Sequence, residues 1–456
     1  MNENNQIYNF SQQEWETCLK VLHALKHNPF ENPDNKQFGT LITKISKKAK
    51  KSNRKESYST KKKEDLQTIQ NSEISKKALE NTTVFQEAAS ENSQSYTKLN
   101  IPKNCYCCNE SFAFAHSFYN RLCPKCAELN YENRFKNLNL TNRNVILTGG
   151  RVKIGYATAL KMLRSNAHVT VTTRFPASAL DLFRQEKDYP NWKANLVVYG
   201  LDLRNLKSVE NFINYYKNSH KTLDILINNA AQTIKYTDQY YTPLIAKEQQ
   251  LALGFTKQKN LIVNETPVAN VKLLENHVNS SYLELNRFGQ PVDTREKNSW
   301  NATLEEISMQ ELIEVNLINQ IAPYFLIKEL LPLLKNSTFE KKHIINVTSS
   351  EGQFSYSNKT MFHPHTNMTK AALNMMTRTS AMNFEKDNIY MNAVDVGWVS
   401  TGARETLRKK QFKKGYIPPL DPVDGASRIV HPIYENEKNN TIFTGKLLKN
   451  YCIVDW

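Results

Sequence analysis

The chain has 456 residues, 40% of them hydrophobic and 23% charged, which is enough to bury a core and to form more than one domain. Its start lacks the basic and apolar regions of a secretory signal, and no uninterrupted run of about 18 apolar residues follows. Composition and hydropathy therefore exclude fibrous, collagen-like and membrane-spanning classes. We expect a soluble protein of the cytoplasm.

The first predicted segment covers residues 1–43 and contains an amphipathic helix over residues 10–27. Ser11 and Glu14 form a capping-box pattern, and Trp15, Leu19 and Leu22 recur at helical spacing. Such an apolar stripe needs a partner surface. We expect this helix to dock on the main domain or on another subunit.

The net charge of +16 is concentrated in residues 44–63, where ten lysines and arginines face one acid, Glu56. A charge run without hydrophobic periodicity is typical of a solvated segment, so we predict a disordered basic linker over residues 44–99. Nuclear localisation or a nucleic-acid tether is the alternative, although we do not expect nucleic acid to be a principal partner.

Five cysteines fall within 22 residues, and four of them form two C-x-x-C pairs. Two such knuckles supply four thiolates to one tetrahedral zinc and leave no open position for water. We therefore predict a structural zinc module over residues 100–135 that could also contact a protein partner. The expected ligands are Cys105, Cys108, Cys123 and Cys126. Cys107 either replaces a neighbouring ligand or stays free.

From Asn142 onward, short β-branched runs alternate with helical patterns. This alternation predicts an α/β fold, a Rossmann-type doubly wound parallel sheet, over residues 136–456. Ligands of such sheets bind at the carboxyl ends of the strands. Residues 234–307 exceed an ordinary strand-to-helix junction, so we predict an inserted lobe or lid there.

A glycine-containing turn, Thr148 to Gly155, follows the first strand and leads into a helix, as in many phosphate-binding turns. In combination with later motifs, this region resembles the short-chain dehydrogenase/reductase family. The matching segments are the T-G-x-x-x-G-x-G fingerprint (Thr148, Gly149, Gly155), Asn228-Asn229-Ala230-Ala231, the helix Asn316, Ser349, and Lys370 of the Y-x-x-x-K pair.

The resemblance implies an NADP-dependent or NAD-dependent oxidoreductase that acts on a carbonyl or alcohol substrate. Arg174 at the end of the second strand suits a 2′-phosphate and favours NADP, unless it is an ordinary solvated residue. The implied coenzyme-binding residues are Thr148, Gly149, Arg151, Lys153, Ile154, Gly155, Arg174, Asp202, Leu203, Asn229, Ala230, Lys370, Gly397 and Thr401. The family also leads us to expect a homo-oligomer.

The implied catalytic residues are Asn316, which holds a water, Ser349, which binds the substrate oxygen, and Lys370, which binds ribose. The family tyrosine that serves as general acid/base is replaced by Thr366, whose hydroxyl is too weak an acid to titrate near neutrality. His365 or His363 are the first candidates to replace it, unless they only pack the helix start. Further candidates from the insert are Tyr236, Tyr240, Tyr241 and His277.

Other departures from the family pattern are Lys153 at the middle glycine, Ala231 at the last glycine of Asn-Asn-Ala-Gly, and Val396 before Gly397. These departures leave a second hypothesis open. In it, the chain is a nucleotide-binding scaffold or sensor that has lost catalysis and uses the zinc module to bind a partner.

Overall fold

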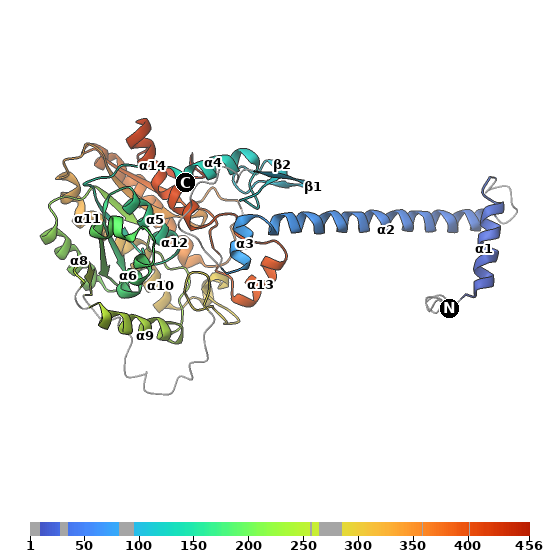
Figure 1. The fold of residues 1–456 in the computed structure, drawn as a ribbon, viewed down its shortest axis with the longest axis horizontal. Coiled ribbons are helices and arrows are strands. Elements are labelled where there is room, and N and C mark those ends of the chain that lie inside the picture. The colour runs from blue at the N-terminus through green and yellow to red at the C-terminus, as the bar shows by residue number, and fades with distance from the viewer. Residues whose placement is uncertain are drawn as a thin grey trace. The chain divides into compact units, whose positions relative to one another are not determined.

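The computed structural model describes residues 10–27, 35–81, 95–255, 258–263, 285–357, 359–400 and 402–456. It divides into two compact units, Met1–Asp65 and Leu66–Trp456. The described part of the first unit is helical, and the second unit contains the β-sheets (Figure 1).

The first unit begins with α1 (Gln12–Ala24), which confirms the predicted amphipathic helix. The capping box is formed, because the Glu14 backbone N–H donates to Ser11 Oγ at 3.3 Å and the Ser11 N–H donates to Glu14 Oε2 at 2.6 Å. None of the residues of α1 is buried. The docking of this helix on the main domain or on another subunit stays a prediction.

The prediction of a disordered linker over residues 44–99 is wrong for most of that segment. Helix α2 (Asn35–Gln70) runs unbroken for 36 residues, and α3 (Glu73–Leu79) follows. Lys, Glu, Gln and Ala are good helix formers and no proline interrupts α2, so a helix forms although residues 41–64 are exposed throughout. Charge composition alone did not distinguish a solvated helix from a coil.

The second unit is built on a nine-stranded sheet in the order β11-β10-β9-β8-β6-β3-β4-β5-β7, and all neighbours are parallel except β11 and β10. This confirms the doubly wound Rossmann-type prediction. The strands are β3 (Asn144–Thr148), β4 (His168–Thr173), β5 (Leu196–Gly200), β6 (Ile225–Asn228), β7 (Leu261–Ile262), β8 (Lys342–Thr348), β9 (Ile389–Asp395), β10 (Leu447–Lys449) and β11 (Cys452–Val454).

Helices cover both faces of the sheet because successive side chains of each buried strand point to opposite sides. On β3, Val145 and Leu147 pack into one core and Ile146 into the other. The first core is closed by α5 (Lys153–Arg164), α6 (Pro176–Arg184) and α14 (Pro422–Asn439). The second is closed by α8 (Leu206–Ser219), α11 (Ala322–Lys335) and α12 (Pro364–Glu385).

The shorter elements of this unit are α7 (Tyr189–Trp192), η2 (Lys193–Asn195), α10 (Met309–Asn316), η6 (Leu317–Ile321), η7 (Ser350–Gly352) and α13 (Glu405–Lys413). In the described part of the chain, one stretch, Met309–Lys335, is long and apolar enough to cross a membrane. Half of it is buried, and Leu326 and Leu330 belong to the second core. Because the core helix of a folded domain can have the same length and hydropathy, this stretch is weak evidence for a membrane span.

The expected insert at residues 234–307 does not form a lobe of its own in its described part. Its helix α9 (Asp238–Gly254) packs on α6, and β7 extends the main sheet by pairing with β5. Two short turns, η4 (Ser299–Asn301) and η5 (Leu304–Glu306), complete it. A strand of two residues is too short to be recognised from hydrophobic pattern, which is why the insert looked separate.

The cysteine-rich module is larger than the predicted residues 100–135. It begins with β1 (Tyr96–Asn104), which pairs antiparallel with β2 (Ser111–His116), and ends with α4 (Pro124–Phe135). Helix α3 joins it, because the backbone N–H groups of Glu73 and Ile74 donate to the carbonyls of Ser117 and Phe118.

Candidate functional site

The turn after β3 brings backbone segments very close together. Gly149 adopts a φ of +71°, and a Cβ on it would lie 2.9 Å from Ala230 Cα. A Cβ on Gly155 would lie 2.1 Å from the carbonyl oxygen of Gly149. Only glycine fits at both positions, and the N-terminus of α5 is thereby left facing a space at the edge of the sheet.

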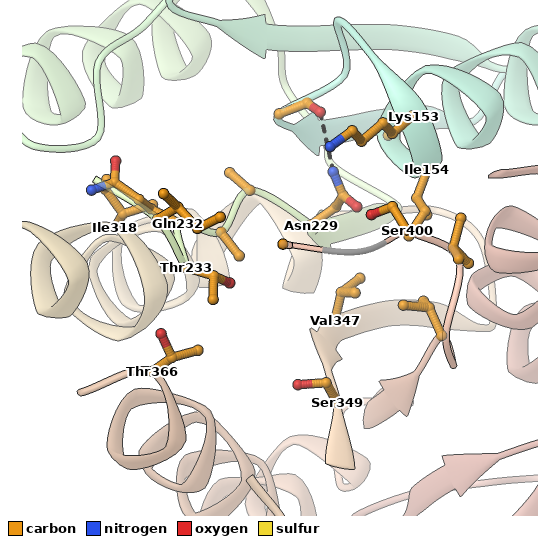
Figure 2. A pocket seen from close by; sticks show the side chains of 18 of the residues that line it. Lys153, Ile154, Asn229, Gln232, Thr233, Ile318, Val347, Ser349, Thr366 and Ser400 are labelled. Atoms are coloured by element: carbon orange, nitrogen blue, oxygen red, sulfur yellow. Dashed lines mark hydrogen bonds between the residues drawn. The ribbon is translucent and has the colours of Figure 1, made fainter. Parts of the chain in front are cut away.

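Thr148 and Asn229 tie this turn to the end of β6. The Thr148 hydroxyl accepts hydrogen bonds from the N–H groups of Asn229 and Ala230, at 3.1 and 3.0 Å. The Asn229 amide donates to the carbonyls of Thr148 and Gly149, at 2.9 and 3.1 Å, and Figure 2 shows the Asn229 side chain among the residues of the pocket. Thr148 therefore acts by fixing the turn and does not itself line the space in front of it.

A cavity of about 790 Å³ opens between β3 and β6, where the strand order reverses. Its size lies within the range of ligand pockets, and its position is the switch point at which doubly wound sheets bind their ligands. The predicted residues that border it are Gly149, Arg151, Lys153, Ile154, Gly155, Arg174, Asp202, Leu203, Asn229, Ala230, Ser349, Thr366, Lys370 and Gly397.

Three of these residues make one end of the cavity strongly cationic. Burial, together with the neighbouring Arg174, lowers the pKa of Arg151 to about 10. Burial, together with Arg287 and Arg151, lowers the pKa of Lys153 to about 8. Within the described residues no acid forms an ion pair with Arg151, Lys153 or Arg174. Arg151 is buried, and Lys153 and Arg174 are half-buried. Cations gathered at a helix N-terminus favour an anionic ligand such as a diphosphate.

Lys153, at the position of the family's middle glycine, does not close the turn. It adopts a φ of +54°, which is costly for a side-chain residue and keeps the glycine-like path of the backbone. Its ammonium lies 5.2 Å from the centre of the Phe288 ring. The side chain therefore borders the cavity as a further cation.

Asp202 and Leu203 border the same cavity at the end of β5. Burial raises the pKa of the Asp202 carboxyl, but hydrogen bonds and charge from Arg204 outweigh that effect and leave it lowered. Gly397 follows β9 with a φ of +77°, and its N–H donates to Asp395 Oδ1 at 2.9 Å. Thr401, the other residue expected in this loop, lies outside the described residues.

The reactive end of the cavity contains Ser349, Thr366 and Lys370. Ser349 follows β8, Thr366 lies in the first turn of α12, and both face the open space of the pocket (Figure 2). The Thr366 hydroxyl is buried and makes no hydrogen bond to the described residues. Lys370 donates to the Val347 carbonyl at 2.7 Å, and burial lowers its pKa to about 8.

Asn316, the predicted helix asparagine of this site, does not border the cavity. Its side chain donates to the Leu312 carbonyl and accepts from Gln320 on its own helix. Asn319 does not border the cavity either, but it holds Gln232, which does. Its amide oxygen accepts from the Gln232 N–H at 2.8 Å, and its amide nitrogen donates to the Gln232 carbonyl and to Thr369 Oγ1, both at 3.0 Å.

The physical reason for this correction is the π-helical turn η6, which widens the helix after Asn316, so that Asn319 and not Asn316 contacts Gln232 and Thr369. Asn319 is 1% exposed and follows Ile318 and Val315 on the buried face. The sequence signal that could have pointed to Asn319 is an amide side chain on the buried face of a helix, because a buried amide needs hydrogen-bond partners.

His365 does not replace the missing phenol, because it does not border the cavity. Its Nε2 lies 3.5 Å from Glu311 Oε1. His363 stacks on Trp300, with ring centroids 4.4 Å apart, and its Nδ1 lies 2.7 Å from the Trp300 carbonyl. Both histidines therefore anchor the start of α12, which was the alternative interpretation of them.

Two of the three candidate tyrosines, Tyr236 and Tyr241, border the cavity, and Tyr240 stacks behind Tyr236 at 3.8 Å. Burial raises the pKa of Tyr236 to about 12 and also raises that of Tyr240. Neither phenol titrates near neutrality. His277, the remaining candidate, lies outside the described residues.

Sequence reasoning missed other residues that border the cavity: Tyr106, Trp300, Glu351, Tyr356, Asp395 and Trp398. Tyr106 comes from the cysteine module, nearly 300 positions from the loop that it contacts. Only tertiary packing brings such residues together, and no local pattern marks them.

The four predicted zinc ligands are gathered as expected. The sulfur atoms of Cys105, Cys108, Cys123 and Cys126 all lie within 4.8 Å of one another, and those of Cys108 and Cys123 are 3.7 Å apart. A tetrahedron of sulfurs about 2.3 Å from zinc has edges of about 3.8 Å, so the set fits that ion.

Cys107 lies beside this set and is not part of it. Hydrogen bonds from Cys107 and then Cys126 lower the pKa of the Cys105 thiol, which favours the thiolate that binds metal. The hydrogen bond to Cys105 raises the pKa of Cys107 to about 12.

A doubly wound sheet with this turn and this cavity at its switch point defines a protein of the dinucleotide-binding Rossmann class. Comparison with known proteins narrows the class. Residues 143–246 match the short chain dehydrogenase family, and residues 295–417 match the enoyl-(acyl carrier protein) reductase branch. The chain belongs to the short-chain dehydrogenase/reductase family.

Individual relatives cover different parts of the chain. An uncharacterized protein of Acanthamoeba polyphaga mimivirus is 34% identical over 347 residues, which is 74% of this chain and 72% of that protein. The short-chain dehydrogenase anuI of Penicillium roqueforti is 29% identical over 209 residues, 41% of this chain and 80% of the relative.

Solved structures also align with it. A short-chain dehydrogenase/reductase of Caenorhabditis elegans with cofactor has a TM-score of 0.47 at 18% identity, covering 68% of this chain and 95% of that one. The RhlG/NADP complex of Pseudomonas aeruginosa has a TM-score of 0.45 at 18% identity, with the same coverage.

Proposed function

We propose that this protein is an NADP-dependent oxidoreductase that transfers hydride between the nicotinamide and the carbon of a small carbonyl or alcohol substrate. The observation that carries the proposal is a single cavity bordered at one end by the glycine turn with Arg151, Lys153 and Arg174, and at the other by Ser349, Thr366 and Lys370. NADP supplies the hydride chemistry when it is bound.

The preference for NADP over NAD rests on the end of β4. Arg174 stands where NAD-binding members of such folds carry an acid for the ribose 2′-hydroxyl. The guanidinium groups of Arg151 and Arg174 lie 5.2 and 5.7 Å from the centre of the same Phe175 ring, and burial and the charge of Arg174 lower the pKa of Arg151. A 2′-phosphate would relieve the repulsion between the two guanidinium groups.

Lys370 is the proposed source of the proton in carbonyl reduction. Its pKa of about 8 makes it the catalytic-end group suited to proton exchange near neutrality. In carbonyl reduction, bound NADPH would supply the hydride that the carbonyl carbon gains, and Lys370 would supply the proton to the oxygen through a bound water or the Thr366 hydroxyl. The Ser349 hydroxyl donates a hydrogen bond to the same oxygen, and Asn319 fixes Thr369, one residue before Lys370.

A catalytically inactive coenzyme-binding scaffold is the second candidate, because Thr366 supplies no phenol. Under both proposals the cysteine module holds a structural zinc, since four protein thiolates leave no position for a reacting water.

The two functions are separated by titrating the purified full chain with NADPH and then assaying a carbonyl panel. The oxidoreductase proposal expects binding and turnover, with turnover lost in Lys370→Ala and retained in Lys328→Ala, a matched change of an exposed lysine on α11. Binding without turnover on every substrate supports the scaffold. Absence of binding refutes both.

A further inference from the structure

Tyr106 connects the cysteine module to the loop that follows β9. It lies between Cys105 and Cys107, yet its side chain borders the coenzyme cavity together with Gly397 and Trp398. Its hydroxyl accepts a hydrogen bond from the Trp398 backbone N–H at 2.7 Å. A Cβ on Gly397 would lie 3.3 Å from that hydroxyl, so the loop passes directly against the phenol.

A second contact comes from the segment that leads into the other cysteine pair. Arg121, two residues before Cys123, accepts the Tyr106 N–H on its carbonyl at 2.9 Å. Its guanidinium lies 5.8 Å from the ring centre of Trp398 and 5.7 Å from that of Tyr416. Both halves of the cysteine site therefore hold the same loop.

The apolar packing between these parts is continuous. Cys105 and Cys123 belong to one buried cluster with Val399 and Leu420, and Ile154 of the glycine turn packs against it. Two proposed zinc ligands, the loop after β9 and the start of α5 thus share one core.

Polar contacts join the module to α14 as well. The Tyr119 hydroxyl donates to Asp424 Oδ1 at 2.7 Å, and Arg134 forms ion pairs with Asp421 at 2.7 Å and Asp424 at 2.9 Å. Gly425 of α14 lies so close to the glycine turn that a Cβ on it would be 2.9 Å from Ile154 Cγ1. The module therefore buttresses the coenzyme cavity through two independent routes.

From these contacts we infer that the cysteine module positions the coenzyme-binding loop, so that metal occupancy and coenzyme affinity are coupled. The inference rests on the proposed NADP function. Metal fixes the 105–108 turn, the turn fixes Tyr106, and Tyr106 holds Gly397 and Trp398 in place before the coenzyme arrives. Without the metal the loop is less ordered, so the coenzyme must order it on binding, and this cost reduces the free energy of coenzyme binding.

The first test measures NADPH affinity of the full chain with zinc bound and after removal of zinc by a chelator. We expect the dissociation constant to rise at least about tenfold on removal and to recover when zinc is restored. Equal affinities would overturn the coupling and leave the proposed function intact. A zinc-loaded protein that binds no NADPH would refute the proposed function itself.

The second test separates Tyr106 from general damage to the module. Tyr106→Phe removes the hydroxyl that accepts from Trp398, and Tyr96→Phe removes one that donates to Glu128 within the same module and does not contact the described part of the loop after β9. With zinc content unchanged in both, we expect NADPH affinity to fall about fivefold in Tyr106→Phe alone. Equal affinities in the two variants would show that the phenol does not transmit the effect.

A third test measures proteolysis of the loop after β9 in the absence of coenzyme. Metal removal should expose the loop after β9 to proteolysis near Trp398, and Tyr106→Phe should do so in part. In a separate titration with coenzyme, reciprocity predicts that NADPH raises the equilibrium affinity for zinc, measured by competition with a chelator, by the same factor by which zinc raises the affinity for NADPH. Unchanged cleavage together with unchanged zinc retention would contradict the inference even if the stripped protein lost activity.

Discussion

Arg174 at the end of β4 places its guanidinium 4.8 Å from the centre of the Tyr241 ring on α9 and donates a hydrogen bond of 3.3 Å to the Tyr241 hydroxyl. Both residues border the cavity. Since a stacked guanidinium is held in one plane, it is preorganised for a phosphate that approaches from the cavity.

Arg174→Ala should therefore weaken NADPH more than NADH. Loss of a charge-assisted contact to the 2′-phosphate predicts a rise of about ten- to a hundredfold in the dissociation constant of NADPH. The affinity for NADH should change little. Arg184→Ala is the matched control, because Arg184 stacks on Phe255 and does not border the cavity. An equal loss for both coenzymes would argue against a 2′-phosphate site.

Coenzyme affinity should also depend on pH. Burial lowers the pKa values of Lys153 and Lys370 to about 8 in the free protein. A bound phosphate-bearing coenzyme favours their protonated forms and raises those pKa values. The favourable contribution is therefore complete below pH 8 and is lost as the pH rises above it.

Fluorescence titration of NADPH between pH 7.5 and 9.5 measures this effect, over a range in which the coenzyme phosphate is fully ionised (pKa of about 6). Lys153→Gln should bind more weakly at pH 7.5 and show a flatter profile, whereas Lys207→Gln on the exposed part of α8 should match the wild type. A profile that is flat in the wild type would contradict the assigned role of these lysines.

Asn319 should matter more for stability than Asn316. Asn319→Leu leaves the buried N–H and carbonyl of Gln232 without their partners, which costs about 1–3 kcal/mol in the free energy of unfolding. Asn316→Ala removes only contacts within its own helix. Chemical denaturation of both variants compares them, and a larger loss at Asn316 would contradict the structural role assigned to Asn319.

Thr366→Tyr tests the chemistry at the catalytic end. A phenol one helical turn before Lys370 restores the family's general acid, and general acid catalysis predicts a rise in turnover of at least about tenfold on a reducible substrate. Thr366→Val serves as the companion variant, because it removes the hydroxyl without adding a phenol. Lower turnover in Thr366→Tyr, with NADPH binding retained, would indicate a substrate that needs the space beside Thr366.

Much of this fold could be predicted from the chain because its signals are local. The turn from Thr148 to Gly155 and the four cysteines are marked by spacing, and the alternation of strands and helices indicated the parallel sheet. Helix α2 was missed because a run of charge was taken as a sign of disorder, although lysine has a favourable helix propensity. The role expected for Asn316 could not be corrected from the sequence, because the π-turn at Leu317–Ile321 has no local signal. Tyr106 reaches the cavity only through packing between segments that are distant in the chain.

Binding of NADP in the cavity at the β3–β6 switch point is measured by isothermal titration of the zinc-loaded full chain with NADPH. We expect one site per chain, with an affinity that is reduced in Arg174→Ala and unchanged in Arg184→Ala. A wild-type titration that shows no binding, or binding unaffected by Arg174→Ala, would contradict this expectation.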